Sequence, residues 1–335
     1  GSVGSGKSNY LAAMSWELRR LLGKRFAVLF TDGDKEANAI LNRYEEALFL
    51  PDDPDKPVVL EKTRTQGDPY HSVRIGGQEM QLPKPFLFSL HPTGIHPRVN
   101  QKNRAGTIVC LYDNAGEHFS VGQDTPLSPV TRHLSRAGVL FFLFDPTQDT
   151  RFRQKCKPVS QDPQVVQPLH TVRQETILTE AAIRVRKYAG LSAYQKYHVP
   201  LLVLVGKSDI WAPLLEGEDI VNDPFWQDPA GKIKLCAVDM DRVERVSAKV
   251  RDLLLEVTPE IVAVAEDFCN EVLYIPVSAL GHSPESQPDK PGLAICPRDV
   301  RPRWVTVPFL YAFARWSSGL IAGIRPSTVA GRTGK

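Results

Sequence analysis

Gly1-Ser2-Val3-Gly4-Ser5-Gly6-Lys7-Ser8 opens the chain and fits the pattern G-x-x-x-x-G-K-[ST] at every position. Glycines in such a loop let successive backbone N–H groups point inward, where they surround phosphate oxygens. The apolar helix predicted over residues 9–22 adds its positive N-terminal end. The stretch therefore predicts a phosphate-binding loop, with Lys7 on the β- and γ-phosphates and the Ser8 hydroxyl on Mg²⁺. The predicted nucleotide contacts of this region are Gly1, Gly4, Ser5, Gly6, Lys7, Ser8 and Asn9.

Phosphate-binding loops normally connect a buried strand to a helix. We therefore expect the natural protein to continue upstream of Gly1 with at least one hydrophobic strand. The alternative interpretation is a Gly/Ser expression tag. The helical pattern after the loop and the motifs further along the chain favour the phosphate-binding interpretation.

The composition is that of a globular protein. Of the 335 residues, 42% are hydrophobic and 24% are charged. The formal net charge of +3 is too small to favour DNA, RNA or a membrane surface as a partner. No apolar run is long enough to span a bilayer. The 5 cysteines lack metal-binding spacing, which is typical of reduced thiols in the cytosol, and the sequence thus predicts a cytoplasmic protein.

Hydrophobic patterning predicts that strands alternate with helices. We expect strands over residues 26–30, 85–90, 107–112, 138–144, 201–205 and 272–277, of which the second and third form an early hairpin. We expect helices over residues 9–22, 35–48, 171–189, 240–256, 259–270 and 306–322, and loops over residues 51–57, 150–168 and 211–233. This order predicts an α/β fold with a mostly parallel sheet and helices on both faces.

The sequence shows no convincing linker between two domains. We therefore predict a single domain over residues 1–325. Insertions are expected around residues 32–62, 150–168 and 211–270, and a flexible tail over residues 326–335.

A second motif, Asp113-Asn114-Ala115-Gly116-Glu117, directly follows the predicted strand 107–112. An Asp at the carboxyl end of a strand beside the phosphate-binding loop is placed to hold Mg²⁺, usually through water. Gly116 would let its backbone N–H approach the γ-phosphate. The alternative interpretation is an ordinary turn at a strand end.

A third motif, Gly206-Lys207-Ser208-Asp209, follows the predicted buried strand 201–205. It resembles the Asn/Thr-Lys-x-Asp motif by which GTPases recognise the base, with glycine in the first position. In that role, the Asp209 carboxylate accepts two hydrogen bonds from the guanine edge, and the aliphatic stem of Lys207 lies along the base. The side chain that glycine lacks normally ties this loop to the phosphate-binding loop, so a reduced affinity is expected. The alternative is a surface turn with ordinary charges.

The fourth motif, Ser278-Ala279-Leu280, follows the predicted strand 272–277 and resembles the loop whose backbone N–H reaches the guanine O6. Together and in this order, the four motifs resemble those of P-loop GTPases of the Ras-like, translation-factor-related class, over essentially the whole chain. The Asp-x-Ala-Gly-Glu stretch is similar to that of bacterial double-GTPases of conflict and signalling systems. The resemblance implies a three-layer P-loop fold, whose first strand is absent from this chain, and a Mg²⁺-dependent GTP-hydrolysing molecular switch.

The resemblance also implies a switch threonine that contacts Mg²⁺, for which Thr63 is the first candidate and Thr65 the second. The residue after the switch glycine is Glu117, where Ras-like proteins use Gln, and His118 follows it. A carboxylate near the γ-phosphate is electrostatically unfavourable, and we therefore predict slow hydrolysis that a partner or self-assembly accelerates. The candidate catalytic residues are Lys7, Thr63, Glu117 and His118, and the candidate metal ligands are Ser8, Thr63 and Asp113.

Two other functions stay open. Glu117 and Gly206 motivate a nucleotide-binding scaffold with little hydrolysis, and an accidental match at residues 206–209 would leave a P-loop ATPase. A partner protein is expected at the switches or at the insertion 211–235, where Trp211, Phe225 and Trp226 form either a partner surface or an apolar cluster. Asp145-Pro146-Thr147 either lines the site or only ends the strand 138–144.

Overall fold

The computed structural model describes residues 1–58, 70–75, 78–101, 106–114, 119, 132–167, 171–286, 293–317 and 319–326. Of the two strands within residues 70–83, and of residue 286, it describes the backbone only. Of the predicted tail 326–335, only the first residue lies within the described part of the chain.

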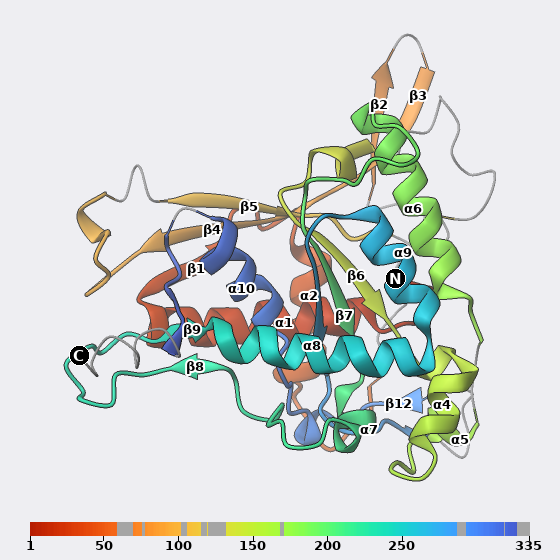
Figure 1. Ribbon diagram of the computed structural model, residues 1–335. Helices are drawn as coiled ribbons and strands as arrows, with labels where there is room; N and C mark the ends of the chain where they lie inside the picture. Colours follow the sequence, from red (N-terminus) through yellow and green to blue (C-terminus); the bar gives the residue numbers. More distant parts are fainter. Residues whose placement is uncertain are drawn as a thin grey trace, which may run out of the picture.

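Two three-stranded sheets form the centre of the molecule (Figure 1). In the parallel sheet, β7 (Leu201–Val205) lies between β10 (Val272–Pro276) and β6 (Leu140–Phe144). In the antiparallel sheet, β4 (Phe86–Pro92) lies between β1 (Val28–Asp32) and β5 (Thr107–Leu111). The fold is therefore mixed α/β, and the expected early hairpin is the pair of β4 and β5.

The remaining elements surround these two sheets. The helices are α1 (Lys7–Leu21), α2 (Ala39–Phe49), α4 (Thr150–Cys156), α5 (Pro163–Val166), α6 (Gln174–Ala189), α7 (Ser208–Trp211), α8 (Met240–Val257), α9 (Pro259–Phe268) and α10 (Val307–Trp316). The small strands are β2 (Tyr70–Ile75) with β3 (Gln78–Pro83), β11 (Glu285–Ser286) with β12 (Leu293–Ala294), and β9 (Ala237–Asp239) between β8 (Phe225–Trp226) and β13 (Gly323–Ile324).

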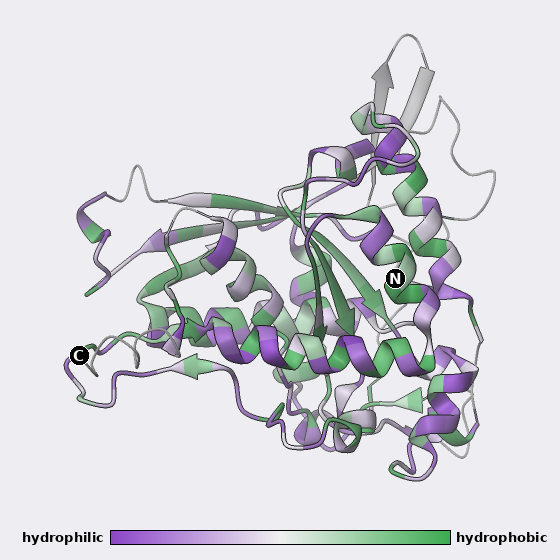
Figure 2. Ribbon diagram, in the orientation of Figure 1, coloured by the Kyte–Doolittle hydropathy of each residue, from purple (hydrophilic) through white to green (hydrophobic). Residues whose placement is uncertain are grey.

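The parallel sheet is the most buried part of the chain. Every residue of β7 is buried, as expected for a central strand with a continuous apolar sequence. Helix α8 crosses the sheet in Figure 1, and Figure 2 shows that apolar and polar residues alternate along it. The Ser247 hydroxyl of α8 accepts a hydrogen bond from the backbone N–H of Tyr274 in β10, at 2.9 Å. The helix is thus fixed against the sheet by both apolar packing and a buried polar contact.

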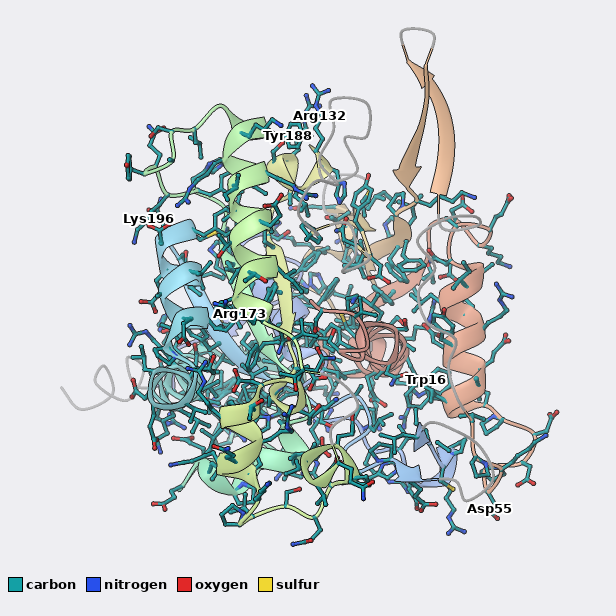
Figure 3. All side chains as sticks on the ribbon, turned by 90° about the vertical axis from the view of Figure 1, so that its right-hand side faces the viewer. Trp16, Asp55, Arg132, Arg173, Tyr188 and Lys196 are labelled. Carbon is teal, nitrogen blue, oxygen red and sulfur yellow. The ribbon has the colours of Figure 1, made fainter. Side chains whose placement is uncertain are left out.

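Aromatic side chains join the antiparallel sheet to its helices. Phe30 of β1 stacks on Phe88 of β4, with ring centroids 4.7 Å apart, and Phe309 of α10 meets Phe30 edge-on at 6.0 Å. The final helix therefore packs on a sheet, as its apolar spacing predicts. Trp16 lies between α1 and α2 in Figure 3, where it stacks on Phe49 at 5.2 Å.

The sequence-based prediction of a loop over residues 150–168 is wrong, because α4 and α5 form there. The Asp149 side chain accepts hydrogen bonds from the backbone N–H groups of Arg151 and Phe152, which caps α4. Phe152 and Cys156, one turn apart, are both buried. The final helix also ends at Trp316 rather than at residue 322.

A wide apolar gap separates the two sheets. The facing edges of β5 and β6 line a cavity of about 1170 Å³, together with aromatic residues of α10. Ile108 of β5, which lines this cavity, is 60% exposed. Within the described part of the chain, no helix is long and apolar enough to cross a membrane.

Candidate functional site

The phosphate-binding loop leads directly into α1. Gly6 is the N-cap residue and has a φ of 85°, in the left-handed region that glycine adopts without strain. Gly4 also has a positive φ, of 71°. The Ser5 hydroxyl donates to the carbonyl oxygen of Ser2 at 2.8 Å, which closes the turn between these glycines. At positions 4 and 6 the backbone thus adopts a conformation that favours glycine.

Lys7 folds back over its own loop. Its Nζ donates to the carbonyl oxygens of Gly1 and Ser2, at 3.2 and 2.6 Å. Lys7 and Asp113, which follows β5, line the same cavity. The first and second motifs are therefore neighbours in space, at the end of β6 where the chain begins in Figure 1.

Two glutamines are hydrogen-bonded to the predicted phosphate-binding loop. The buried Ser2 hydroxyl donates to Gln148 Oε1 at 2.6 Å and lies 3.2 Å from Gln174 Oε1. Gln148 Nε2 in turn donates to the carbonyl oxygen of Val3 at 2.9 Å. The amide of Gln174 pairs with the backbone of Asp145, donating at 2.8 Å and accepting at 2.9 Å. The loop is thus hydrogen-bonded to the segment that follows β6.

Lys207 is held by three acceptors. Its Nζ donates to Asp145 Oδ2 at 2.8 Å, to Thr147 Oγ1 at 2.8 Å and to Gln164 Oε1 at 2.6 Å. Asp145 is fully buried and also accepts from the N–H and hydroxyl of Thr147. An ammonium group has three donors, and all three are used here. The turn after β6 therefore does more than end the strand, because it positions Lys207.

Gly206 stands where a side chain would meet the neighbouring strand. A Cβ on it would lie 3.3 Å from the carbonyl oxygen of Phe144, to which the Gly206 N–H donates at 2.8 Å. Other residues supply the connection that an asparagine side chain would make. Lys207 donates to Asp145, Gln174 donates to the backbone of Asp145, and Ser2 donates to Gln174. The predicted base-recognition loop after β7 and the predicted phosphate-binding loop are therefore linked without the missing side chain.

Asp209 and Ser278 bring the third and fourth motifs together. The Ser278 hydroxyl donates to Asp209 Oδ1 and accepts from the backbone N–H of Gly281 at 2.8 Å. Burial raises the pKa of the Asp209 carboxyl, although the Ser278 hydrogen bond opposes the shift. The backbone of Ser278 also exchanges two hydrogen bonds with that of Arg303, which fixes the loop from its other side.

One cavity collects three of the four motifs. Its wall includes Ser5, Gly6 and Asn9 of the first motif, Gly206, Lys207 and Asp209 of the third, and Ser278, Ala279 and Leu280 of the fourth. Asn9 Oδ1 is buried in this wall and has no hydrogen-bond partner among the described residues. Segments more than two hundred residues apart in the sequence therefore meet around a cavity that offers donors and acceptors to a ligand.

Several predicted residues lie outside the described part of the chain. They are the switch candidates Thr63 and Thr65 and the second-motif residues Gly116, Glu117 and His118. The oxygen donors of Ser8 and Asp113 suit Mg²⁺, which takes one or two protein ligands and completes its shell with phosphate and water. Among the described residues, no group of three or more His, Cys, Asp and Glu side chains could hold a metal ion by itself.

Two aromatic residues of the 211–235 insertion contact other parts of the chain. Trp211 is fully buried, and its indole N–H donates to the carbonyl oxygen of Gly206 at 2.9 Å. Phe225 is half-buried and meets Phe26 edge-on at 5.5 Å. The partner-surface interpretation is therefore wrong for Trp211, which is buried and hydrogen-bonded to the loop that follows β7.

Sequence reasoning missed four residues of this site: Gln148, Asp162, Gln164 and Gln174. Asp162-Pro163 carries a readable signal, because an Asp before a Pro is typical of a helix N-terminus. The three glutamines carry no local signal, since their partners are distant in sequence.

The chain matches no protein-family model, no curated protein and no solved structure. The functional conclusion therefore depends on the residues and on the geometry described above.

Proposed function

We propose that this chain binds GTP with Mg²⁺, hydrolyses it slowly and acts as a molecular switch on a partner protein. The observation that carries the proposal is the cavity shared by Ser5, Gly6 and Asn9, by Lys207 with Asp209, and by Ser278, Ala279 and Leu280. The partly buried Asp209 carboxylate at its wall suits the two adjacent N–H donors of guanine, which adenine does not present in that arrangement.

In this proposal each motif has one task. Lys7 exchanges the carbonyl oxygens of Gly1 and Ser2 for the β- and γ-phosphates, which are stronger acceptors because they are charged. Ser8 and Asp113, with Thr63, hold Mg²⁺, which offsets the negative charge of the phosphates when bound. Glu117 and His118 are the candidates for positioning the attacking water.

The proposed fold is a three-layer P-loop fold. The gap between the edges of β5 and β6 has apolar walls and is bordered by Gly1 at the end of β6. The parallel sheet of β10, β7 and β6 supports this proposal, because the glycine-rich loop lies against Leu143 of β6 and leads directly into α1.

Equilibrium binding of GTP, GDP and ATP to the protein in the presence of Mg²⁺ tests the proposal. We expect GTP and GDP to bind more tightly than ATP, and Lys7→Ala to weaken all three by removing a phosphate contact. ATP binding equal to or tighter than GTP binding would leave a P-loop ATPase instead. Tight GTP binding without phosphate release, with or without added partner, would leave a scaffold.

A further inference from the structure

Asp162 is a buried carboxylate in the wall of the proposed base cavity. The residue is 2% exposed and precedes α5, where its Oδ1 accepts from the backbone N–H of Gln164 at 2.7 Å. Its Oδ2 is buried without a hydrogen-bond partner among the described residues. Leaving a buried acceptor unsatisfied is destabilising, and more so when the group is charged. This oxygen is therefore positioned to accept a donor from a molecule that enters the cavity.

The lysine that lines this cavity does not supply that donor. Lys207 lines the same cavity, but its three N–H donors go to Asp145, Thr147 and Gln164. Asp209 lines the cavity as well. Burial raises the pKa of the Asp209 carboxyl, and the charge of Asp162 raises it further. Two carboxylates that share one cavity favour a ligand edge rich in N–H donors.

Guanine has such an edge. It presents N1–H and two hydrogens on the 2-amino group, and one carboxylate can accept N1–H together with one amino hydrogen. The second amino hydrogen then needs another acceptor. Adenine presents only its 6-amino group, and hypoxanthine lacks the 2-amino group altogether.

We propose that Asp162 is a second specificity-determining residue, whose Oδ2 accepts the 2-amino hydrogen of guanine that Asp209 leaves free. The inference rests on the proposed function, because it assigns the base of the same site. In this arrangement Asp209 reads N1–H and the 2-amino group together, while Asp162 reads the 2-amino group alone.

Binding of GTP and ITP, with Mg²⁺, to the wild-type protein and to Asp162→Asn tests the proposal. Asparagine keeps the N-cap to Gln164, since it caps helices as well as aspartate, but it turns an N–H₂ group toward the cavity. We expect the variant to bind GTP about 10-fold more weakly and ITP about equally. Serine also caps helices but lacks the second carboxylate oxygen. We therefore expect Asp162→Ser, like Asp162→Asn, to bind GTP more weakly than the wild type and ITP about equally.

Asp149→Asn is the matched control. Asp149 caps α4 in the same way but does not line the cavity, so its variant should bind both nucleotides as the wild type does. An equal loss of GTP and ITP affinity in both Asp162 variants overturns the proposal, as does unchanged GTP affinity. Wild-type protein that binds GTP no better than ATP overturns the proposed function itself, and with it the role of Asp162.

Discussion

The ion pair between Lys207 and Asp145 is expected to stabilise the loop that follows β7 strongly. Its Nζ–Oδ2 distance is 2.8 Å, the Asp145 side chain is fully buried, and 20% of the Lys207 side chain is exposed. Removing one partner of such a pair leaves the other charge buried and costs about 3–5 kcal/mol. We therefore expect Lys207→Met to lower the free energy of unfolding by about 3 kcal/mol, at the low end because the lysine is partly solvated.

A double-mutant cycle in urea isolates the pair itself. We expect a coupling energy of about 2 kcal/mol between Lys207→Met and Asp145→Asn, because the second substitution removes the stranded charge. Lys155 and Glu256 form the matched control pair, with a shorter separation of 2.6 Å but side chains 40% and 61% exposed. Their coupling should stay below about 1 kcal/mol. A Lys207–Asp145 coupling as small as that of the control would refute the claim that burial makes this pair strong.

Burial raises the pKa of Asp209, so GTP affinity should fall as the pH drops through that raised pKa. Calorimetry across this pH range is the measurement, and Asp209→Asn should show no such fall. Burial also raises the pKa of Asp223 from 3.8 to about 6, with a smaller contribution from the charge of Glu17. The folded state then holds this proton more tightly than the unfolded state, so the stability it adds is full below pH 3.8 and is lost as the pH rises to about 6. Relative to Asp223→Asn, the wild type should lose about 3 kcal/mol over this range, as measured by urea unfolding at each pH. Phe152→Ala should lower the free energy of unfolding by about 4 kcal/mol, because this buried ring contacts Phe144 and Trp211, and a loss below about 1 kcal/mol would contradict its place in the core.

The buried strands and long helices were predictable because their patterns are local. The run Leu201–Val205 is apolar at every position and forms the central strand, and the helices 240–256 and 259–270 match α8 and α9 within two residues. The sheets themselves were predicted only in part. The hairpin of β4 and β5 was predicted, but strand periodicity does not reveal how the other strands pair, so their division between two separate sheets had no sequence signal.

The site was predictable where a motif follows a strand and unpredictable where partners are remote. Lys207 and Asp209 were identified from their position after β7, and the structure places them beside the phosphate-binding loop. The fully buried Asp145 was read as a turn or a site residue, and only its contact with Lys207 settles that it positions the motif. Gln174 stands 29 residues from Asp145 and has no local pattern that marks it.

The central claim is that Asp209 reads the guanine edge, and exchanging its chemistry tests that claim most directly. Asp209→Asn replaces one acceptor oxygen by an N–H₂ donor, which matches xanthine, where a 2-oxo group replaces the 2-amino group. Competition among GTP, XTP and ATP for the wild-type protein and this variant is the measurement. We predict that the wild type prefers GTP to XTP by about 100-fold and that the variant reverses the preference. Equal binding of GTP and ATP by the wild type, or an unchanged preference in the variant, would contradict the account.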